Sequence, residues 1–119
     1  MPIVTLITDL GNKDFYLSTV KAALYREQVD LDVVDITHHI ARYDISQAAF
    51  VLKNVMHHFP AGTIHMIGVS SKSTDNIRHL AFDYDGQKII CADNGFFSLI
   101  AEKKADLIVE LNLLKMKKI

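Results

Sequence analysis

Short apolar runs alternate with stretches of helical periodicity, and this alternation constrains the fold more than any other feature of the chain. Residues 3–8 form a β-branched apolar run, and the turn formers Gly11 and Asn12 follow it. From Asp14 the apolar residues recur at near-helical spacing, with Asp14 placed to cap the first turn. We therefore expect a buried strand, a loop and a helix of about four turns. The apolar positions of that helix are Phe15, Val20, Ala23 and Leu24.

The rest of the chain continues in the same way. Residues 31–36 predict a second strand, and Asp44 precedes a second helical pattern over residues 45–56. The expected order therefore begins β-α-β-α. Further along we expect a strand at 63–69, a hairpin of 80–84 and 88–91 turned by Asp85-Gly86, a short helix from Asn94-Gly95 and a final strand at 107–111.

This order predicts one α/β domain over residues 1–119, with a mostly parallel Rossmann-like sheet, helices on both faces and an antiparallel hairpin. Half of the residues are hydrophobic and 23% are charged, which is typical of a soluble globular protein. A formal net charge of -1 leaves no basic field for nucleic acid, and no apolar run approaches the roughly 20 residues of a membrane span. The single cysteine, Cys91, excludes an internal disulfide, and the start without a leader indicates a cytoplasmic protein.

The loop after the first strand is the first candidate site, because ligands of open parallel sheets bind beyond the carboxyl ends of the strands. It holds two carboxylates, Asp9 and Asp14, at a spacing that lets both face one crevice. An ionised carboxylate has two acceptor oxygens, so Asp9 is suited to hold both hydroxyls of a ribose. The alternative is that Asp9 satisfies turn amides and Asp14 is an ordinary helix cap.

Residues 7–14, Ile-Thr-Asp-Leu-Gly-Asn-Lys-Asp, resemble the opening of the SAM hydroxide adenosyltransferase family and its fluorinase and chlorinase relatives. The resemblance continues in Val-Asp-Ile-Thr-His at 34–38, in residues 47–52 with 59–65, and in Asp-Asn-Gly-Phe-Phe at 93–97. These matches occur in the family's order and cover nearly the whole chain. The sequence is therefore similar to the N-terminal, SAM-binding domain of that family.

The resemblance implies a crevice for SAM or adenosine in which Asp9 holds the ribose hydroxyls and Asp14 lies near the methionine portion. Tyr43 stands where the family has an aromatic or apolar residue of the pocket wall. Asn94 matches the family's Asp-Asn-Gly segment, and it either bonds polar atoms of the ligand or serves as a turn or cap residue. The resemblance also implies a homotrimer with sites between subunits, and no cofactor besides the substrate SAM.

The sequence departs from the family after the third strand, where the hydrolases carry an Asp-Pro-Gly-Val-Gly-x-x-Arg-like loop. Ser70 stands in place of that Asp, and Arg78 lies one position later than the family's Arg. Ser70 and Arg78 are thus the candidate catalytic residues. Because a serine cannot be an anionic partner of water, hydrolysis by the family's route would need Asp75 or a residue beyond this chain. The family's β-rich C-terminal domain is also absent, so the chain is interpreted as a fragment.

Two functions follow from these residues. The first is the SAM-binding domain of an enzyme that hydrolyses SAM to adenosine and methionine by attack at the ribose C5′. The second is a non-catalytic module that binds nucleosides or forms oligomers, for which Ser70 is the main support. A phosphate-handling domain is disfavoured, because the first loop has one glycine and carboxylates that repel phosphate.

Six histidines raise the question of a metal site. They occur as two adjacent pairs, whose members point to different sides of an element, and as two single residues. Since no chelating spacing is present, we expect no metal and interpret most of them as surface or helix-end residues. The six are His38, His39, His57, His58, His65 and His79.

Overall fold

Six strands form one sheet in the computed structural model, which describes residues 2–11, 15–69 and 78–111. The strand order is β2-β1-β3-β5-β4-β6. Strands β2, β1, β3 and β5 pair in parallel, whereas β4 runs antiparallel to both β5 and β6. This is the mostly parallel α/β sheet that the sequence predicts. The elements are β1 (Ile3–Thr8), α1 (Tyr16–Glu27), β2 (Asp32–Thr37), α2 (Ile45–Val55), the 3-10 turn η1 (Met56–His58), β3 (Ile64–Gly68), β4 (His79–Tyr84), β5 (Gln87–Ala92), α3 (Phe96–Ile100) and β6 (Leu107–Leu111).

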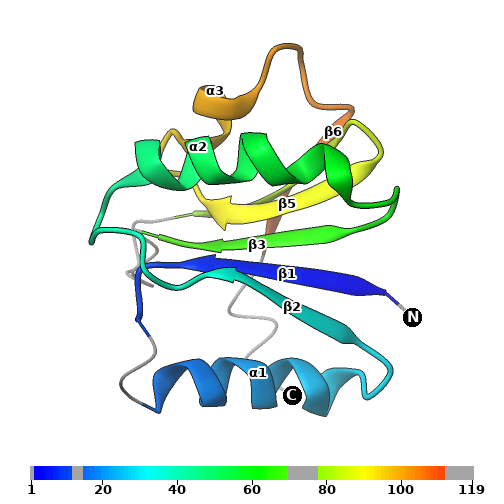
Figure 1. Ribbon diagram of the computed structural model, residues 1–119. Helices are drawn as coiled ribbons and strands as arrows, with labels where there is room; N and C mark the ends of the chain where they lie inside the picture. Colours follow the sequence, from blue (N-terminus) through cyan, green and yellow to red (C-terminus); the bar gives the residue numbers. More distant parts are fainter. Residues whose placement is uncertain (1, 12–14, 70–77, 112–119) are drawn as a thin grey trace.

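The crossovers around β1 place helices on both faces of the sheet. The chain passes from β1 through α1 to β2 on one side, and from β2 through α2 to β3 on the other side of β1. Because parallel crossovers are right-handed, two crossovers in opposite directions put their helices on opposite faces. Figure 1 shows α1 on one side of the sheet and α2 with α3 on the other. The predicted two-faced arrangement is confirmed.

The main core lies between the sheet and the two helices α2 and α3. Helix α2 contributes Ala48, Ala49 and Leu52, all buried. Asp44 caps this helix by accepting a hydrogen bond from the backbone amide of Gln47 at 3.0 Å. These contacts fix α2, and with it the loop that leads into α2 from β2.

The β4–β5 hairpin turns at Asp85 and Gly86, as predicted. Both residues have positive φ, 54° and 78°. Two consecutive residues with positive φ are what a two-residue type I′ turn requires, and Asp-Gly is a favoured pair there. Local turn chemistry was therefore sufficient to place this hairpin.

Helix α1 differs from its prediction in the face that it buries. Phe15 and Ala23 are exposed, while Val20, Lys21 and Leu24 are half-buried. Lys21 is drawn to this face because its ammonium group pairs with a carboxylate of β2. The helix cap is the backbone of Phe15, without a side-chain hydrogen bond, and the predicted cap residue Asp14 lies outside the described residues.

Candidate functional site

The carboxyl ends of β1, β3 and β5 lie side by side and are joined by hydrogen bonds beyond the strands. The Asp9 amide donates to the carbonyl of Gly68 at 3.4 Å, which links the ends of β1 and β3. The Asn94 side chain donates to the carbonyl of Val69 at 3.1 Å, which links the ends of β3 and β5. The structure thus brings Asp9 and Asn94 to the same edge of the sheet, on either side of the end of β3, where ligands of such sheets bind.

Asp9 is held by the loop that leads into α2. Its carboxylate accepts a hydrogen bond from the Tyr43 backbone amide at 3.2 Å. Tyr43 has φ 64°, an uncommon value for a large residue, and its side chain is 53% exposed. Gln47 steadies the same loop by accepting from the Ala41 amide at 2.9 Å. Tyr43 therefore lies beside Asp9 with an exposed side chain, and its role in a pocket wall stays a prediction.

Asn94 uses both ends of its side-chain amide within the fold. Its Nδ2 donates to Val69, and its Oδ1 accepts from the Phe96 amide at 3.0 Å, at the first residue of α3. Gly95, with φ 86°, lies between them. These bonds favour the interpretation of Asn94 as a turn and cap residue, and its role toward a ligand stays a prediction.

Arg78 directly precedes β4 and pairs with Asp93, which directly follows β5. Its Nη2 lies 2.6 Å from the Asp93 carboxylate, and the side chain is 59% exposed. The hydrogen bond and charge of Asp93 raise the pKa of Arg78 above its ordinary value. Ser70 and Asp75 lie outside the described residues, as Asp14 does, so the catalytic assignment of Ser70 and Arg78 stays a prediction.

The histidine interpretation is wrong for two of the six residues. His39, His57 and His58 are exposed, as expected, but His38 and His65 are buried. Each of the two is bonded to a buried threonine of β1 through one ring nitrogen and to a further polar side chain through the other. The sequence does contain a signal for these buried histidines, namely Thr5 and Thr8 inside an apolar strand. A buried hydroxyl requires a hydrogen-bond partner, and a histidine can supply one.

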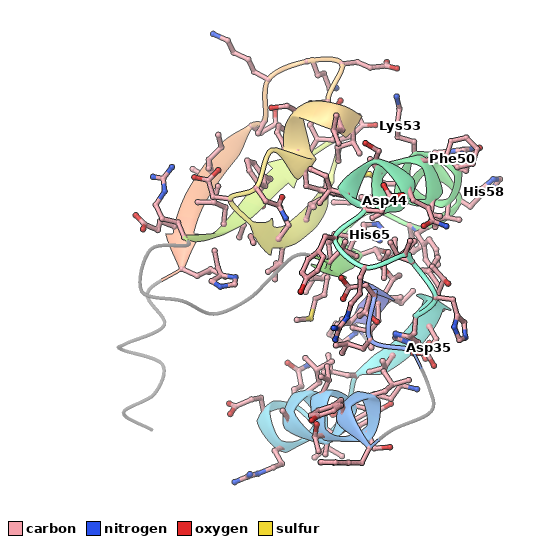
Figure 2. The ribbon with its side chains drawn as sticks, turned by 90° about the vertical axis from the view of Figure 1, so that its left-hand side faces the viewer. Asp35, Asp44, Phe50, Lys53, His58 and His65 are labelled. Carbon is pink, nitrogen blue, oxygen red and sulfur yellow. The ribbon has the colours of Figure 1, made fainter. Side chains whose placement is uncertain are left out.

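His38 connects β2 to the end of β1. Its Nδ1 lies 2.7 Å from the Thr8 hydroxyl, and its Nε2 lies 2.7 Å from the Asp35 carboxylate. Lys21 of α1 donates to the same carboxylate at 2.6 Å. Partial burial opposes ionisation of Asp35, but the bonds from Lys21 and His38 outweigh it and hold its pKa below the ordinary value. Figure 2 shows Asp35 on the side of the sheet that faces α1.

His65 makes a separate chain of hydrogen bonds on the α2 side of the sheet, where Figure 2 shows it. The Thr5 hydroxyl lies 2.6 Å from its Nδ1, and Gln87 accepts at its Nε2. The Gln87 amide in turn donates to the carbonyls of Met56 and Phe59. Burial lowers the pKa of His65, and the bond to Gln87 offsets only part of that effect. This chain ties three strands to the end of α2.

Metal ligation finds no support in the part of the chain that the structure describes, where no three His, Cys, Asp or Glu side chains form a cluster able to hold an ion. None of the helices over residues 2–11, 15–69 and 78–111 has the length and apolar character of a membrane span.

Comparison with known proteins gives a consistent result. The family model of the SAM hydroxide adenosyltransferase N-terminal domain matches residues 4–118. The (R)-S-adenosyl-L-methionine hydrolase of Methanocaldococcus jannaschii is 27% identical over 108 residues, which are 87% of this chain and 41% of the relative. The hydrolase of the same name from Thermus thermophilus is 27% identical over 96 residues, 81% of this chain and 37% of the relative. The chain thus spans about two-fifths of the length of these relatives.

Solved structures show the same fold. A conserved protein of Thermotoga maritima superposes with a TM-score of 0.84 at 26% identity, covering 92% of this chain and 42% of that one. A conserved hypothetical protein of Thermus thermophilus gives a TM-score of 0.83 at 25% identity, covering 98% and 49%.

Proposed function

Because this chain belongs to the SAM hydroxide adenosyltransferase family, whose N-terminal domain it matches, we propose that it is the SAM-binding domain of an adenosyl-transferring enzyme. The reaction proposed is hydrolysis of SAM to adenosine and methionine. The observation that carries the proposal is the place of Asp9, whose carboxylate lies at the carboxyl end of β1, between β2 and β3, and is held there by the Tyr43 amide. The names of the two hydrolase relatives support the substrate.

Asp9 is proposed to bind the ribose of SAM. Ribose presents two adjacent hydroxyl donors, and an ionised carboxylate presents two acceptor oxygens with several lone pairs. The Tyr43 amide takes up one lone pair of Oδ2 and sets the orientation of the group. Tyr43 itself is proposed as a wall of the pocket, and Asp14 as a contact near the methionine portion.

The chemical step is a displacement at the ribose C5′. The water oxygen bonds to C5′, the bond from C5′ to sulfur breaks with its electron pair going to sulfur, and one proton of water is released. Methionine leaves as a neutral thioether, so the positive charge of the sulfonium is lost in the step. Because SAM carries its own leaving group, the proposal requires no cofactor. The domain's contribution is alignment of C5′ with the nucleophile.

A second candidate is a non-catalytic module that binds nucleosides or forms oligomers. It is favoured by one observation, the serine at position 70 where the family's hydrolases carry an aspartate. Arg78, the other candidate catalytic residue, is paired with Asp93. A homotrimer and a cytoplasmic location belong to the first proposal as its implied assembly and compartment.

Calorimetric titration with SAM and adenosine, followed by chromatography of the SAM mixture, tests these candidates. Binding with release of adenosine and methionine supports the enzyme, if not by this chain then by a longer version carrying the family's C-terminal domain. Binding of adenosine without products supports the module. Absence of binding by both versions overturns the proposal.

A further inference from the structure

Thr8, His38 and Asp35 form a hydrogen-bonded relay that ends on the loop carrying Asp9. We propose that this relay is a positioning device, which holds the Asp9 carboxylate in the orientation that accepts a ribose diol. The inference rests on the proposed function of Asp9. His38 and Thr8 act through Asp9 and do not themselves touch the ligand.

The contacts of the relay run in series. The ionised Asp35 carboxylate can only accept, so Nε2 of His38 donates to it. The Thr8 hydroxyl contacts Nδ1 of His38 at 2.7 Å, and its oxygen also accepts the Leu10 amide at 3.3 Å. The relay therefore reaches across Asp9, from the residue before it to the residue after it.

A β-bulge makes the relay possible. The register of β1 against β2 pairs Leu6 with Asp35 and then Ile7 with Thr37, so Ile36 is an extra residue. Side chains three apart in a regular strand point to opposite faces, but one extra residue brings Asp35 and His38 to the same side. The contact between Asp35 and His38 therefore depends on this bulge.

The backbone around the relay repeats the same connection. The carbonyl of His38 accepts from the Gly11 amide at 2.7 Å, and the carbonyl of Thr8 accepts from the Ile40 amide at 3.3 Å. The segment from Thr8 to Gly11 is thus joined to the start of the β2–α2 loop, whose other end supplies the Tyr43 amide to Asp9. Asp9 is held from both ends of one loop.

Thr8 is buried and Thr5 offers a matched control. Both threonines lie in β1, both are fully or almost fully buried, and both hydroxyls contact the Nδ1 of a buried histidine. Thr5 lies on the α2 side of the sheet, and its bonds lead to Gln87 and away from Asp9. Thr5→Val and Thr8→Val therefore remove the same hydroxyl from the same strand with different consequences for the site.

The test compares adenosine with 2′,3′-dideoxyadenosine, which lacks the diol. We expect the unaltered chain and the Thr5→Val variant to prefer adenosine by about tenfold or more by calorimetry, a ratio that corresponds to about 1.4 kcal/mol. In Thr8→Val that preference falls to about threefold or less, because only the diol contact is disturbed, and Thr8→Ser restores it. A loss of stability alone would weaken both ligands equally and leave their ratio unchanged.

Three outcomes are decisive. If Thr8→Val keeps the full preference while the unaltered chain shows it, the relay does not position Asp9 and the proposed function stands. If the unaltered chain does not distinguish the two nucleosides, the assignment of Asp9 to ribose fails, and this inference fails with it. Hydrogen exchange at the Leu10 amide tests the relay without ligand: faster exchange in Thr8→Val than in Thr5→Val supports it, and equal exchange overturns it.

Discussion

The Asp9 carboxylate accepts a hydrogen bond from the backbone amide of Tyr43 at 3.2 Å, across 34 positions of sequence. Asp9 follows β1, and Tyr43 belongs to the loop before α2. The contact therefore depends on the parallel pairing of β1 with β2, which brings the ends of these strands to one edge. It defines the candidate site and leads to the first prediction.

Replacing Asp9 with Asn should weaken adenosine binding by roughly 10- to 100-fold, because a charged acceptor contributes about 1.5–3 kcal/mol per hydrogen bond. Asp83→Asn is the control, since Asp83 is a half-buried carboxylate that pairs with Lys88 at the opposite end of the strands. Calorimetric titration of both variants measures the difference. Equal affinity in the Asp9 variant and the unaltered chain would remove Asp9 from the ribose contact.

Tyr43 has positive φ, and this predicts an inverted order of stability for two small substitutions. Glycine adopts positive φ readily, whereas alanine retains the steric cost of the left-handed region. We expect Tyr43→Gly to unfold with a free energy about 1 kcal/mol higher than that of Tyr43→Ala. Urea unfolding of the two variants gives this difference directly. A less stable glycine variant would show that the loop relaxes to negative φ once the tyrosine is gone.

The hairpin and the site differ in how far the sequence could predict them. Asp85-Gly86 specifies its turn by local backbone preference, so the residues themselves were sufficient. The relay depends on a bulge at Ile36 and on the contact between Thr8 and His38, which are 30 positions apart. Hydrophobic periodicity predicts neither of these features. The spacing of the histidines does not separate His38 from those that lie at the surface, and the sequence does not show which strand ends become neighbours. The position of Asp9 at the edge of the sheet was predictable, because it follows once β1 is predicted to end just before Asp9.

The helix α1 was predicted correctly, but the face that it buries was predicted only in part. Spacing alone assigned Phe15 and Ala23 to the buried face of α1, but the structure exposes both. The face that turns to the sheet includes Lys21, a residue that apolar periodicity leaves out, because Asp35 lies opposite it. Val20 and Leu24 are half-buried, as their apolar spacing predicts, and the ion pair adds Lys21 to the same face.

Burial of His65 predicts that folding stability falls when the pH is lowered below about 6.5, the ordinary histidine pKa. The pKa of His65 is lowered in the folded chain, so the unfolded chain binds a proton there that the folded chain does not. Stability therefore rises with pH across this window, by up to about 1.4 kcal/mol per pH unit for one proton, and this contribution is constant above it. Urea unfolding between pH 5 and 7.5 measures the slope. His65→Gln should show a shallower slope, and an unchanged slope would assign the effect to other groups.

The close approach of Gly68 to Thr8 supplies the last prediction. A Cβ atom placed on Gly68 would lie 3.1 Å from Cγ2 of Thr8, closer than ordinary van der Waals contact. Gly68→Ala should therefore displace Thr8 and destabilise the chain by about 1–3 kcal/mol, as added atoms do in packed interiors. Serine lacks Cγ2 but keeps the hydroxyl, so Thr8→Ser introduced into Gly68→Ala should recover much of that loss.

A double-mutant cycle in urea isolates this contact. We expect the two substitutions together to cost less than the sum of their separate costs, by about 0.5–3 kcal/mol. Among these proteins Gly68→Ala alone should show a reduced preference for adenosine over its dideoxy analogue, because the displaced Thr8 hydroxyl is the one that anchors the Asp9 loop. Additive costs would mean that Gly68 and Thr8 do not meet in solution. Coupled stability with an unchanged ligand preference would confine their contact to packing and separate it from the site.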